Sequence, residues 1–295
     1  MKATCIEELK TLENDGNQII GLPAEMEKSS VSFVGKNNIL FFEDGVRLHN
    51  SRITFHGNKS IVFICSGGER RTQVLVDAYH ENVFYLGKNC NTTRPIHVVL
   101  SERRHIIIGD SCLFSLEVWF RNSDPHLIYS AKTKERINPT KSVYLGDHVW
   151  IGQSALVSKG TQIGSGSIVG AMAMTGGRRI PSNCAVGGVP ANVISRDIFW
   201  DKQSVHAFRY AQTQESMQYD SDEFIYEKDS TTLRFDDIDR GINQIKDMNE
   251  RLEYLKKTLY ENTDKNRFFI ANVKKSKTKK LIAKLKKIIK KILKK

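Results

Sequence analysis

The chain has 295 residues, and 40% of them are hydrophobic, which is enough to build a substantial core. Its formal net charge is +12, from 45 basic and 33 acidic residues. Twelve lysines lie within residues 274–295, which hold no acidic residue, so the rest of the chain carries 33 charges of each sign. Because residues 1–273 carry no net charge, this part of the chain is not expected to bind a polyanion through overall charge. Any anionic partner would bind the C-terminal tail.

The cysteines are scattered and form no CxxC pair; they are Cys5, Cys65, Cys90, Cys112 and Cys184. This usage is typical of a reducing compartment and argues against a zinc site. The N-terminus lacks the apolar core of a signal peptide, and no run approaches the roughly 20 apolar residues of a membrane-spanning helix. We therefore expect a cytoplasmic protein without a metal.

Residues 1–20 are expected to form an N-terminal cap, followed by a β-helix domain over residues 21–195. Between Val31 and Leu100, short aliphatic and aromatic runs such as KSIVFI, TQVLV and NVFYL recur at spacings nearer seven or ten than six. We interpret these runs as wide, irregular coils of a β-solenoid. A separate β-sandwich is the alternative.

A six-residue repeat occupies the stretch from Leu145 to Met174. An aliphatic residue returns at every sixth position, at Leu145, Ile151, Val157, Ile163 and Val169. A spacing of six residues matches neither the helical period nor the strand period. The six glycines of the stretch also make a helix unfavourable. Each hexad can form one short strand and a turn, and three hexads make a coil of about 18 residues in a parallel β-helix. Ordinary short strands with glycine turns are the alternative.

The repeat is interrupted once. It runs through Ile108, Phe114 and Phe120, stops at His126, and resumes at Leu145. Residues 126–144 are therefore predicted to form a loop that leaves the β-helix, and loops on rigid scaffolds commonly carry functional residues.

Three motifs lie within or beside this loop: Ser123-Asp124-Pro125-His126, Arg136-Ile137-Asn138-Pro139, and the strand from Gly146 to Gly152. Over about residues 105 to 196 the chain resembles the hexapeptide-repeat acyltransferases, specifically the subgroup that O-acetylates bacterial capsular polysaccharides and exopolysaccharides. The resemblance implies a left-handed β-helix, a homotrimer, acetyl-CoA as donor and a capsular polysaccharide as acceptor.

His126 occupies the position of the catalytic histidine in this family. Histidine suits the removal of a proton from a sugar hydroxyl because its unperturbed pKa lies near 6.5. Asp124 is expected to orient the imidazole or bind the acceptor, or else to cap the loop. Trp150 is expected to donate its indole N–H to the thioester or oxyanion and to pack on pantetheine; packing between subunits is the alternative. One coil and the loop separate His126 from Trp150, so we expect both side chains in one groove.

The resemblance places acetyl-CoA between two neighbouring β-helices. The predicted cofactor-binding residues are Trp150, Gly152, Ser154, Ala171, Arg178, Arg179 and Arg196. The backbone near Gly152, Ser154 and Ala171 would contact pantetheine. The arginines would bind phosphate, because the lysine of the family's usual Thr-Lys-Asp turn is missing from this sequence. Lys159 is a further phosphate candidate.

A zinc site is the competing interpretation. His148 lies two residues before Trp150 on the same side of a strand, and with His126 and His105 it would give the three histidines of a β-helix carbonic anhydrase. The spacing does not resemble that family, so the sequence predicts no metal.

Beyond a connector over residues 196–235, a seven-residue repeat begins. Ile238, Ile245, Leu252 and Leu259 fall on it, which predicts a coiled-coil helix over residues 236–262 and is compatible with three strands. A single amphipathic helix packed on the body is the alternative.

Residues 274–295 place aliphatic side chains at helical spacing and lysines on the opposite face. This predicts a basic amphipathic helix that binds the anionic inner face of the cytoplasmic membrane, or membrane-associated capsule machinery. Nucleic acid is a poorer partner because the tail has no aromatic residue or Arg to stack on bases.

Together these features predict an acetyl-CoA-dependent O-acetyltransferase that modifies a sugar hydroxyl of a capsular polysaccharide by direct, His-assisted attack. Two alternatives stay open. One is N-acetylation of an amino sugar on a nucleotide- or lipid-linked precursor, and the other is a non-catalytic β-helix scaffold of a capsule assembly complex.

Overall fold

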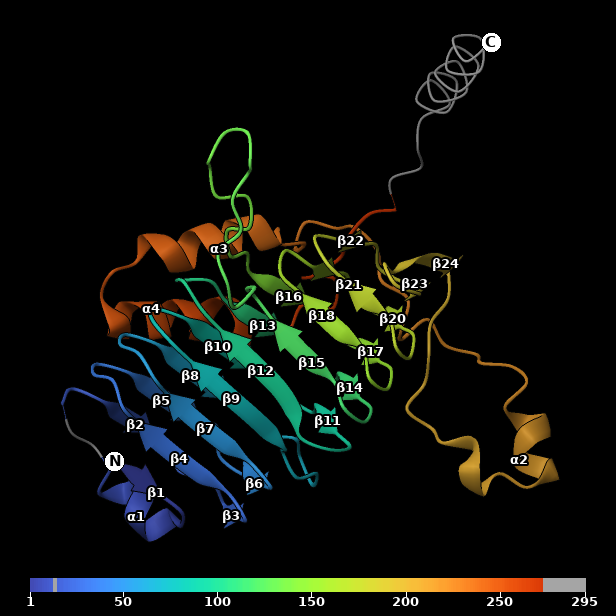
Figure 1. Cartoon of the computed structure of the whole chain (residues 1–295). Helices are drawn as coiled ribbons and strands as arrows, with labels where there is room; N and C mark the ends of the chain where they lie inside the picture. The colour runs from blue at the N-terminus through green and yellow to red at the C-terminus, as the bar shows by residue number, and fades with distance from the viewer. Residues whose placement is uncertain (13–14, 273–295) are drawn as a thin grey trace.

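The computed structural model describes residues 1–12 and 15–272, so the predicted basic helix at 274–295 lies outside the described residues. Short strands wind into stacked coils, and nearly every strand pairs in parallel with the strand one coil away (Figure 1). The result is the parallel β-helix that the six-residue repeat predicts.

Three long sheets form its faces. Sheet 1 contains, in order, β1 (Lys2–Ala3), β4 (Ser30–Phe33), β7 (Arg52–Phe55), β9 (Val74–Ala78), β12 (Ile96–Leu100), β15 (Trp119–Arg121), β18 (Leu156–Ser158) and β21 (Met174–Thr175). Sheet 2 contains β2 (Gln18–Ile20), β5 (Ile39–Phe42), β8 (Ile61–Ile64), β10 (Val83–Leu86), β13 (Ile106–Ile108), β16 (Val143–Leu145), β19 (Gln162–Ile163) and β22 (Arg179–Ile180). Sheet 3 contains β11 (Asn91–Thr92), β14 (Leu113–Phe114), β17 (Trp150–Ile151), β20 (Ile168–Val169), β23 (Cys184–Gly187) and β24 (Asn192–Arg196), and a separate pair is formed by β3 (Glu25–Glu27) and β6 (Arg47–His49).

The coils change width along the axis. Ile39 pairs with Ile61, 22 residues later, whereas Leu145 pairs with Ile163, 18 residues later. The irregular N-terminal runs are thus wide coils of the same solenoid. Their parallel pairing rules out the β-sandwich alternative, whose sheets are antiparallel.

The interior is one continuous apolar column. The five aliphatic residues of the six-residue repeat are all fully buried within it; they are Leu145, Ile151, Val157, Ile163 and Val169. Gly152 shows why glycine follows so many of these positions, because a Cβ there would lie 2.5 Å from the amide nitrogen of Ala171 in the next coil.

Both ends of the β-helix reverse strand direction. At the N-terminal end, β1 pairs antiparallel with β4, and α1 (Ile6–Lys10) buries Leu9 in the core. The first coil already begins with β2 at Gln18, inside the predicted cap. At the C-terminal end, β24 pairs antiparallel with β23.

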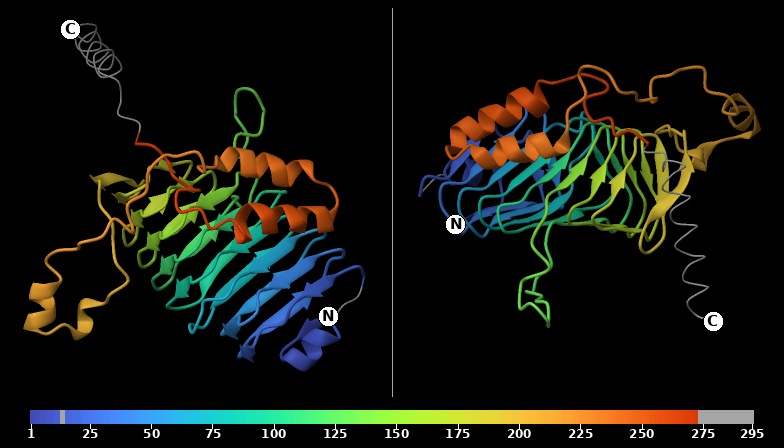
Figure 2. Two further views of the ribbon diagram at one scale, coloured as in Figure 1. Left: turned by 180° about the vertical axis from the view of Figure 1, so that it is seen from behind. Right: turned by 90° about the horizontal axis from the view of Figure 1, so that it is seen from above.

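The C-terminal helices cover the outer face of sheet 2 (Figure 2). They are α3 (Phe235–Gln244), α4 (Met248–Leu255) and the π-helical turn Lys256–Tyr260. Buried side chains such as Ile242 and Leu255 form one apolar cluster with outward-facing residues of the sheet, including Phe63 and Tyr85. The central strands of sheet 2, namely β8, β10, β13 and β16, are therefore buried on both faces. Within the described part of the chain, no helix is long and apolar enough to cross a membrane.

The structure corrects the predicted coiled coil over residues 236–262. The backbone is extended at Ile245, and Asp247 begins a new helix by accepting hydrogen bonds from the amides of Asn249 and Glu250. The buried guanidinium of Arg251 donates to the carbonyl of Ile245 and stabilises this break. Ile238, Leu252 and Leu259 of the heptad pack in the apolar cluster with the chain's own sheet 2, which is closer to the packed-helix alternative.

Candidate functional site

The predicted loop is present. It leaves sheet 1 after β15, enters sheet 2 at β16, and so projects from the edge where these two sheets meet (Figure 1). Tyr129 and Arg136 form an antiparallel bridge between its two arms. Several apolar side chains of the loop are exposed, at 48–61% of their area: Leu127, Ile128, Tyr129 and Ile137.

A polar cluster holds the base of the loop. The carboxylate of Asp124 accepts a hydrogen bond from Asn138 Nδ2 at 3.0 Å and pairs with the ammonium of Lys159. Hydrogen bonding from Lys159, the largest contribution, lowers the pKa of Asp124. Asn138 Nδ2 also donates to the carbonyl oxygen of His126 at 2.8 Å. Asp124 thus anchors the loop and does not contact the imidazole, while Lys159 is committed to Asp124 rather than free for a phosphate.

A second ion pair fixes the other arm. Arg136 donates to both carboxylate oxygens of Glu102, at 2.7 and 2.9 Å, and the hydroxyl of Thr140 also contacts Glu102. These hydrogen bonds lower the pKa of Glu102 to about 2. Sequence reasoning missed Glu102, although Arg136 belongs to the Arg-Ile-Asn-Pro motif that it singled out.

His126 lies on this anchored loop with its side chain exposed. Its backbone is held by Asn138, and its imidazole has no hydrogen-bond partner within the described chain. The ring is therefore free to meet a hydroxyl group from outside the chain, which a general base requires.

Trp150 lies on sheet 3. Its ring is half-buried, its Nε1 donates to Ser115 Oγ at 3.3 Å, and it packs at a tilt against Trp200 with ring centroids 5.9 Å apart. His148 is clamped between the rings of Trp200 and Phe224, with centroids 4.0 and 4.1 Å away. Sequence reasoning missed this aromatic support of the Trp150 strand.

The structure does not bring His126 and Trp150 together in one chain. The loop of His126 leaves the edge between sheets 1 and 2, whereas Trp150 lies on sheet 3, the remaining face of the prism. The expectation that one coil and a loop would place both side chains in one groove is therefore wrong for a single chain.

The predicted cofactor residues divide in the same way. Gly152, Ser154 and Ala171 follow strands of sheet 3, in the turns toward sheet 1, and the Ser154 hydroxyl donates to Glu117 at 2.8 Å. Arg178 and Arg179 lie at the edge between sheets 1 and 2, on the His126 side. Arg196 lies on β24, where it donates to Asn272. One chain thus carries two separate groups of predicted site residues, one beside Trp150 and the other on the side of His126.

The three histidines of the zinc interpretation are separated. His105 is buried beside Val83, whose amide donates to its Nδ1 at 3.1 Å, while His148 lies in its aromatic clamp and His126 on the loop. In the described residues, no group of three or more His, Cys, Asp or Glu side chains is placed to hold a metal ion.

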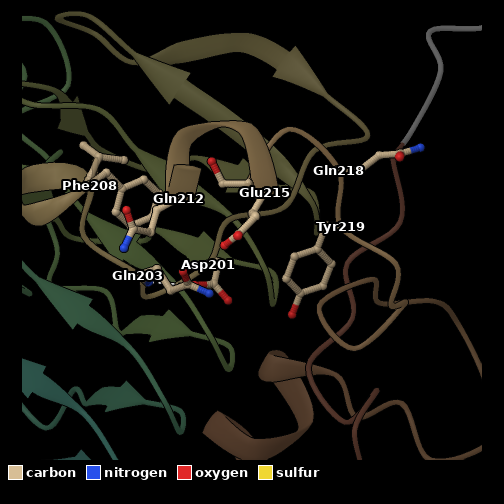
Figure 3. Close-up of a pocket in the computed structure, with 9 residues that line it drawn as sticks. Asp201, Gln203, Phe208, Gln212, Glu215, Gln218 and Tyr219 are labelled. Carbon is tan, nitrogen blue, oxygen red and sulfur yellow. Dashed lines mark hydrogen bonds between the residues drawn. The ribbon is translucent and has the colours of Figure 1, made fainter. Parts of the chain in front are cut away.

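A cavity of about 470 Å³ lies in the connector, around α2 (Tyr210–Glu215). Asp201, Gln212, Glu215 and Tyr219 line it (Figure 3). None of the predicted site residues belongs to its lining, so it is separate from the candidate site.

No family model matches the sequence. The chain is 28% identical over 182 residues to the polysialic acid O-acetyltransferase of Neisseria meningitidis, covering 62% of this chain and 84% of that protein. It is 30% identical over 102 residues to the polysialic acid O-acetyltransferase of Escherichia coli O1:K1 / APEC, covering 35% of this chain and 33% of that protein. The crystal structure of the polySia-specific acetyltransferase NeuO matches with a TM-score of 0.58 and 26% identity, over 68% of this chain and 93% of NeuO. The chain is thus similar in sequence to polysialic acid O-acetyltransferases and similar in fold to NeuO.

The structural similarity to NeuO confirms the predicted left-handed β-helix. The C-terminal helices α3 and α4 are added to that β-helix and bury the outer face of sheet 2. They also reach the edge from which the loop departs, because Asp239 of α3 accepts a hydrogen bond from Ser142 at 2.5 Å.

Proposed function

We propose that this chain transfers the acetyl group of acetyl-CoA to a sugar hydroxyl of a bacterial capsular polysaccharide. The observation that carries the proposal is the alignment with a polysialic acid O-acetyltransferase across 84% of that protein's length. The exposed imidazole of His126, on a loop anchored by Asp124 and Asn138, supplies the base that such a transfer requires.

In the proposed reaction, His126 takes the proton of the sugar hydroxyl while its oxygen attacks the thioester carbonyl. A carbon–oxygen bond forms, the carbon–sulfur bond breaks, and the proton passes to the departing thiolate of CoA. The indole N–H of Trp150 and nearby backbone amides stabilise the oxyanion. Pantetheine lies along the turns at Gly152, Ser154 and Ala171.

The separation of His126 and Trp150 within one chain supports a homotrimer whose sites lie between subunits. Each site would take His126 from one protomer and Trp150 from its neighbour. The exposed apolar side chains of the loop support this arrangement, because a neighbouring subunit would cover them. In this arrangement Arg178 and Arg179 meet the CoA phosphates from the His126 side, and Arg196 remains a candidate from β24.

The basic tail at 274–295 would hold this trimer on the anionic inner face of the cytoplasmic membrane. Three tails per trimer would make the attachment multivalent. The support comes from the sequence alone, through the alternation of aliphatic and lysine positions.

Incubation of the purified protein with labelled acetyl-CoA and capsular polysaccharide tests the reaction. Label should enter the polymer and be released by mild base, because O-acetyl esters are base-labile whereas N-acetyl groups are not. Label that survives mild base would replace the proposal with N-acetylation. A chain that does not bind acetyl-CoA in calorimetry would be a scaffold instead.

A further inference from the structure

A polar groove of about 430 Å³ adjoins the base of the His126 loop. One wall is the end of the loop, including Lys141 and Ser142, and the opposite wall is helix α3, with Asp236 and Asp239. Its size lies within the range of small-molecule sites. The groove exists because α3 packs beside the β-helix at this edge.

The groove is connected to the anchored loop through the covalent chain. Asn138, which binds the carbonyl of His126, immediately precedes Pro139 in the groove wall. Lys159, which binds Asp124, immediately precedes Gly160 in the same wall. A molecule in the groove therefore lies next to the residues that fix the position of His126.

The floor of the groove is rigid and polar. Ser142 and Tyr144 both donate hydrogen bonds to Asp239 Oδ1, at 2.5 and 2.8 Å, and Asn243 donates to Asp239 Oδ2 at 3.2 Å. Burial raises the pKa of the Tyr144 hydroxyl well above its usual value, with Asp239 adding to the effect. Asp239 is thus occupied by the protein itself and holds α3 against the loop base.

The rim, by contrast, carries exposed charged groups. Lys141 is exposed and has no ion-pair partner in the described residues, and the guanidinium of Arg104, 40% exposed, lies 3.6 Å from Asp239. Asp236, 52% exposed, accepts a hydrogen bond from Gln162 at 2.7 Å and lies 3.9 Å from the exposed guanidinium of Arg234. Two cations thus face a carboxylate and an amide across one groove. This pattern complements a sugar that carries a carboxylate and several hydroxyls.

We propose that this groove binds an acidic sugar residue of the acceptor chain, and that helix α3 thereby takes part in acceptor selection. Lys141 and Arg104 bind the sugar carboxylate, while Asp236 and Gln162 bind its hydroxyls. The proposal rests on the acetyltransferase function proposed above, and it assigns the C-terminal helices a role in recognition as well as in stability.

Kinetics with a sialic acid oligomer as acceptor test the groove. Lys141→Gln and Asp236→Asn should each raise the acceptor KM by about tenfold, since each replaces a charge-assisted hydrogen bond to the sugar by a weaker neutral one. The KM for acetyl-CoA and kcat should stay at wild-type values. Lys257→Gln and Asp237→Asn are matched controls, because both residues are exposed on the same C-terminal helices and neither lines the groove. Unchanged acceptor KM in both groove variants overturns the proposal.

Saturation-transfer NMR on the full chain separates this proposal from the reaction itself. The sialic acid oligomer should give a signal with wild-type protein that is lost in Lys141→Gln, and neutral maltohexaose should give none that depends on Lys141. Oligomer binding that depends on Lys141 without any acetyl transfer would refute the reaction and retain the groove. Acetyl transfer at a wild-type KM in both variants would refute the groove and retain the reaction.

Discussion

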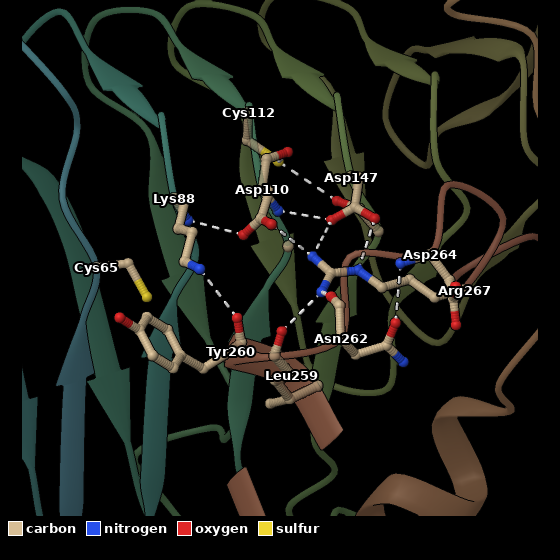
Figure 4. Close-up of polar contacts among 12 residues, drawn as sticks. Cys65, Lys88, Asp110, Cys112, Asp147, Leu259, Tyr260, Asn262, Asp264 and Arg267 are labelled. Carbon is tan, nitrogen blue, oxygen red and sulfur yellow. Dashed lines mark hydrogen bonds and ion pairs between the residues drawn. The ribbon is translucent and has the colours of Figure 1, made fainter. Parts of the chain in front are cut away.

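The guanidinium of Arg267 forms a double hydrogen bond with the carboxylate of Asp147, 120 positions earlier in the chain, at 2.9 and 2.7 Å (Figure 4). A second carboxylate, Asp110, lies 2.8 Å from the same group, and the Arg267 side chain is only 2% exposed. The backbone carbonyls of Leu259 and Asn262 accept its remaining donors. This contact joins the segment after the C-terminal helices to two successive coils of the β-helix.

Replacing Arg267 by Ala should lower the free energy of unfolding by about 3–5 kcal/mol, because the buried carboxylate of Asp147 and the partly buried one of Asp110 would lose their partner. Urea unfolding followed by circular dichroism measures the change. Arg240→Ala is the control; Arg240 forms only an exposed ion pair with Asp237, so its loss should cost less than about 1 kcal/mol. Equal effects of the two substitutions would show that the Arg267 contact does not hold the helices in place.

His105 should make stability depend on pH. Burial, the largest cause, lowers the pKa of this imidazole to about 4, whereas in the unfolded chain it lies near 6.5. Protons therefore favour the unfolded chain between these values, so the stabilisation is complete above pH 6.5 and is lost as pH falls through 4. The loss is on the order of 3 kcal/mol.

The variant His105→Asn tests this by removing the titration while keeping an acceptor for the Val83 amide. Its stability should fall less than that of the wild type between pH 7 and pH 4. The two proteins must be compared with each other because Asp110 titrates in the same pH range. Burial raises the pKa of Asp110 to about 6, so this group destabilises the fold as pH rises from 4 to 6 in both proteins. Parallel pH profiles for the two proteins would exclude a role for His105.

His126→Ala should reduce kcat by about 10²- to 10⁴-fold, the usual contribution of a general base. Because the side chain is exposed, the melting temperature should not change. His206→Ala changes another exposed histidine, on the 3₁₀ turn Val205–Ala207, and should retain full activity. Wild-type kcat in His126→Ala would remove the proposed base.

A mixture of two inactive variants should regain activity if each site is shared. After unfolding and refolding together in equal amounts, His126→Ala and Trp150→Ala should give about a quarter of wild-type activity, the fraction of interfaces that combine an intact His126 with an intact Trp150. Each variant refolded alone is the control. A mixture no more active than its components would place both residues in one chain.

Removal of residues 274–295 should abolish sedimentation of the protein with phosphatidylglycerol vesicles and leave acetyl transfer in solution unchanged. The reason is that the truncation removes the excess lysines and the aliphatic face together. Phosphatidylcholine vesicles serve as the uncharged control. Sedimentation of the truncated chain with anionic vesicles at the wild-type level would rule out the tail as the anchor.

The β-helix could be predicted from the sequence because every inward residue of the six-residue repeat lies in the same apolar environment. Ile151, Val157 and Ile163 occupy equivalent positions in a stack, so the repeat determines both the fold and the place where it is interrupted. The loop and its exposed histidine follow from that interruption. The motif around Asn138 predicted a functional loop, but not which side chains would hold it.

The C-terminal helices were harder to predict, because a heptad does not specify what it packs against. A signal was present in the N-terminal half, where Ile39–Phe42, Ile61–Ile64 and Val83–Leu86 are apolar at every position rather than at alternate ones. Such strands are buried on both faces, and this implies a covering element elsewhere in the chain. The relation between His126 and Trp150 was missed because it depends on which face of the prism each coil position occupies.

The reversed strands at the two ends of the β-helix have a consequence for assembly. A parallel stack with an open final rung offers a template on which the next molecule can continue the ladder, as in fibres. Here β1 and β24 run against that ladder at opposite ends. Because β1 covers the end of sheet 1 and β24 covers the end of sheet 3, continuation of those two sheets from one molecule into the next should be disfavoured.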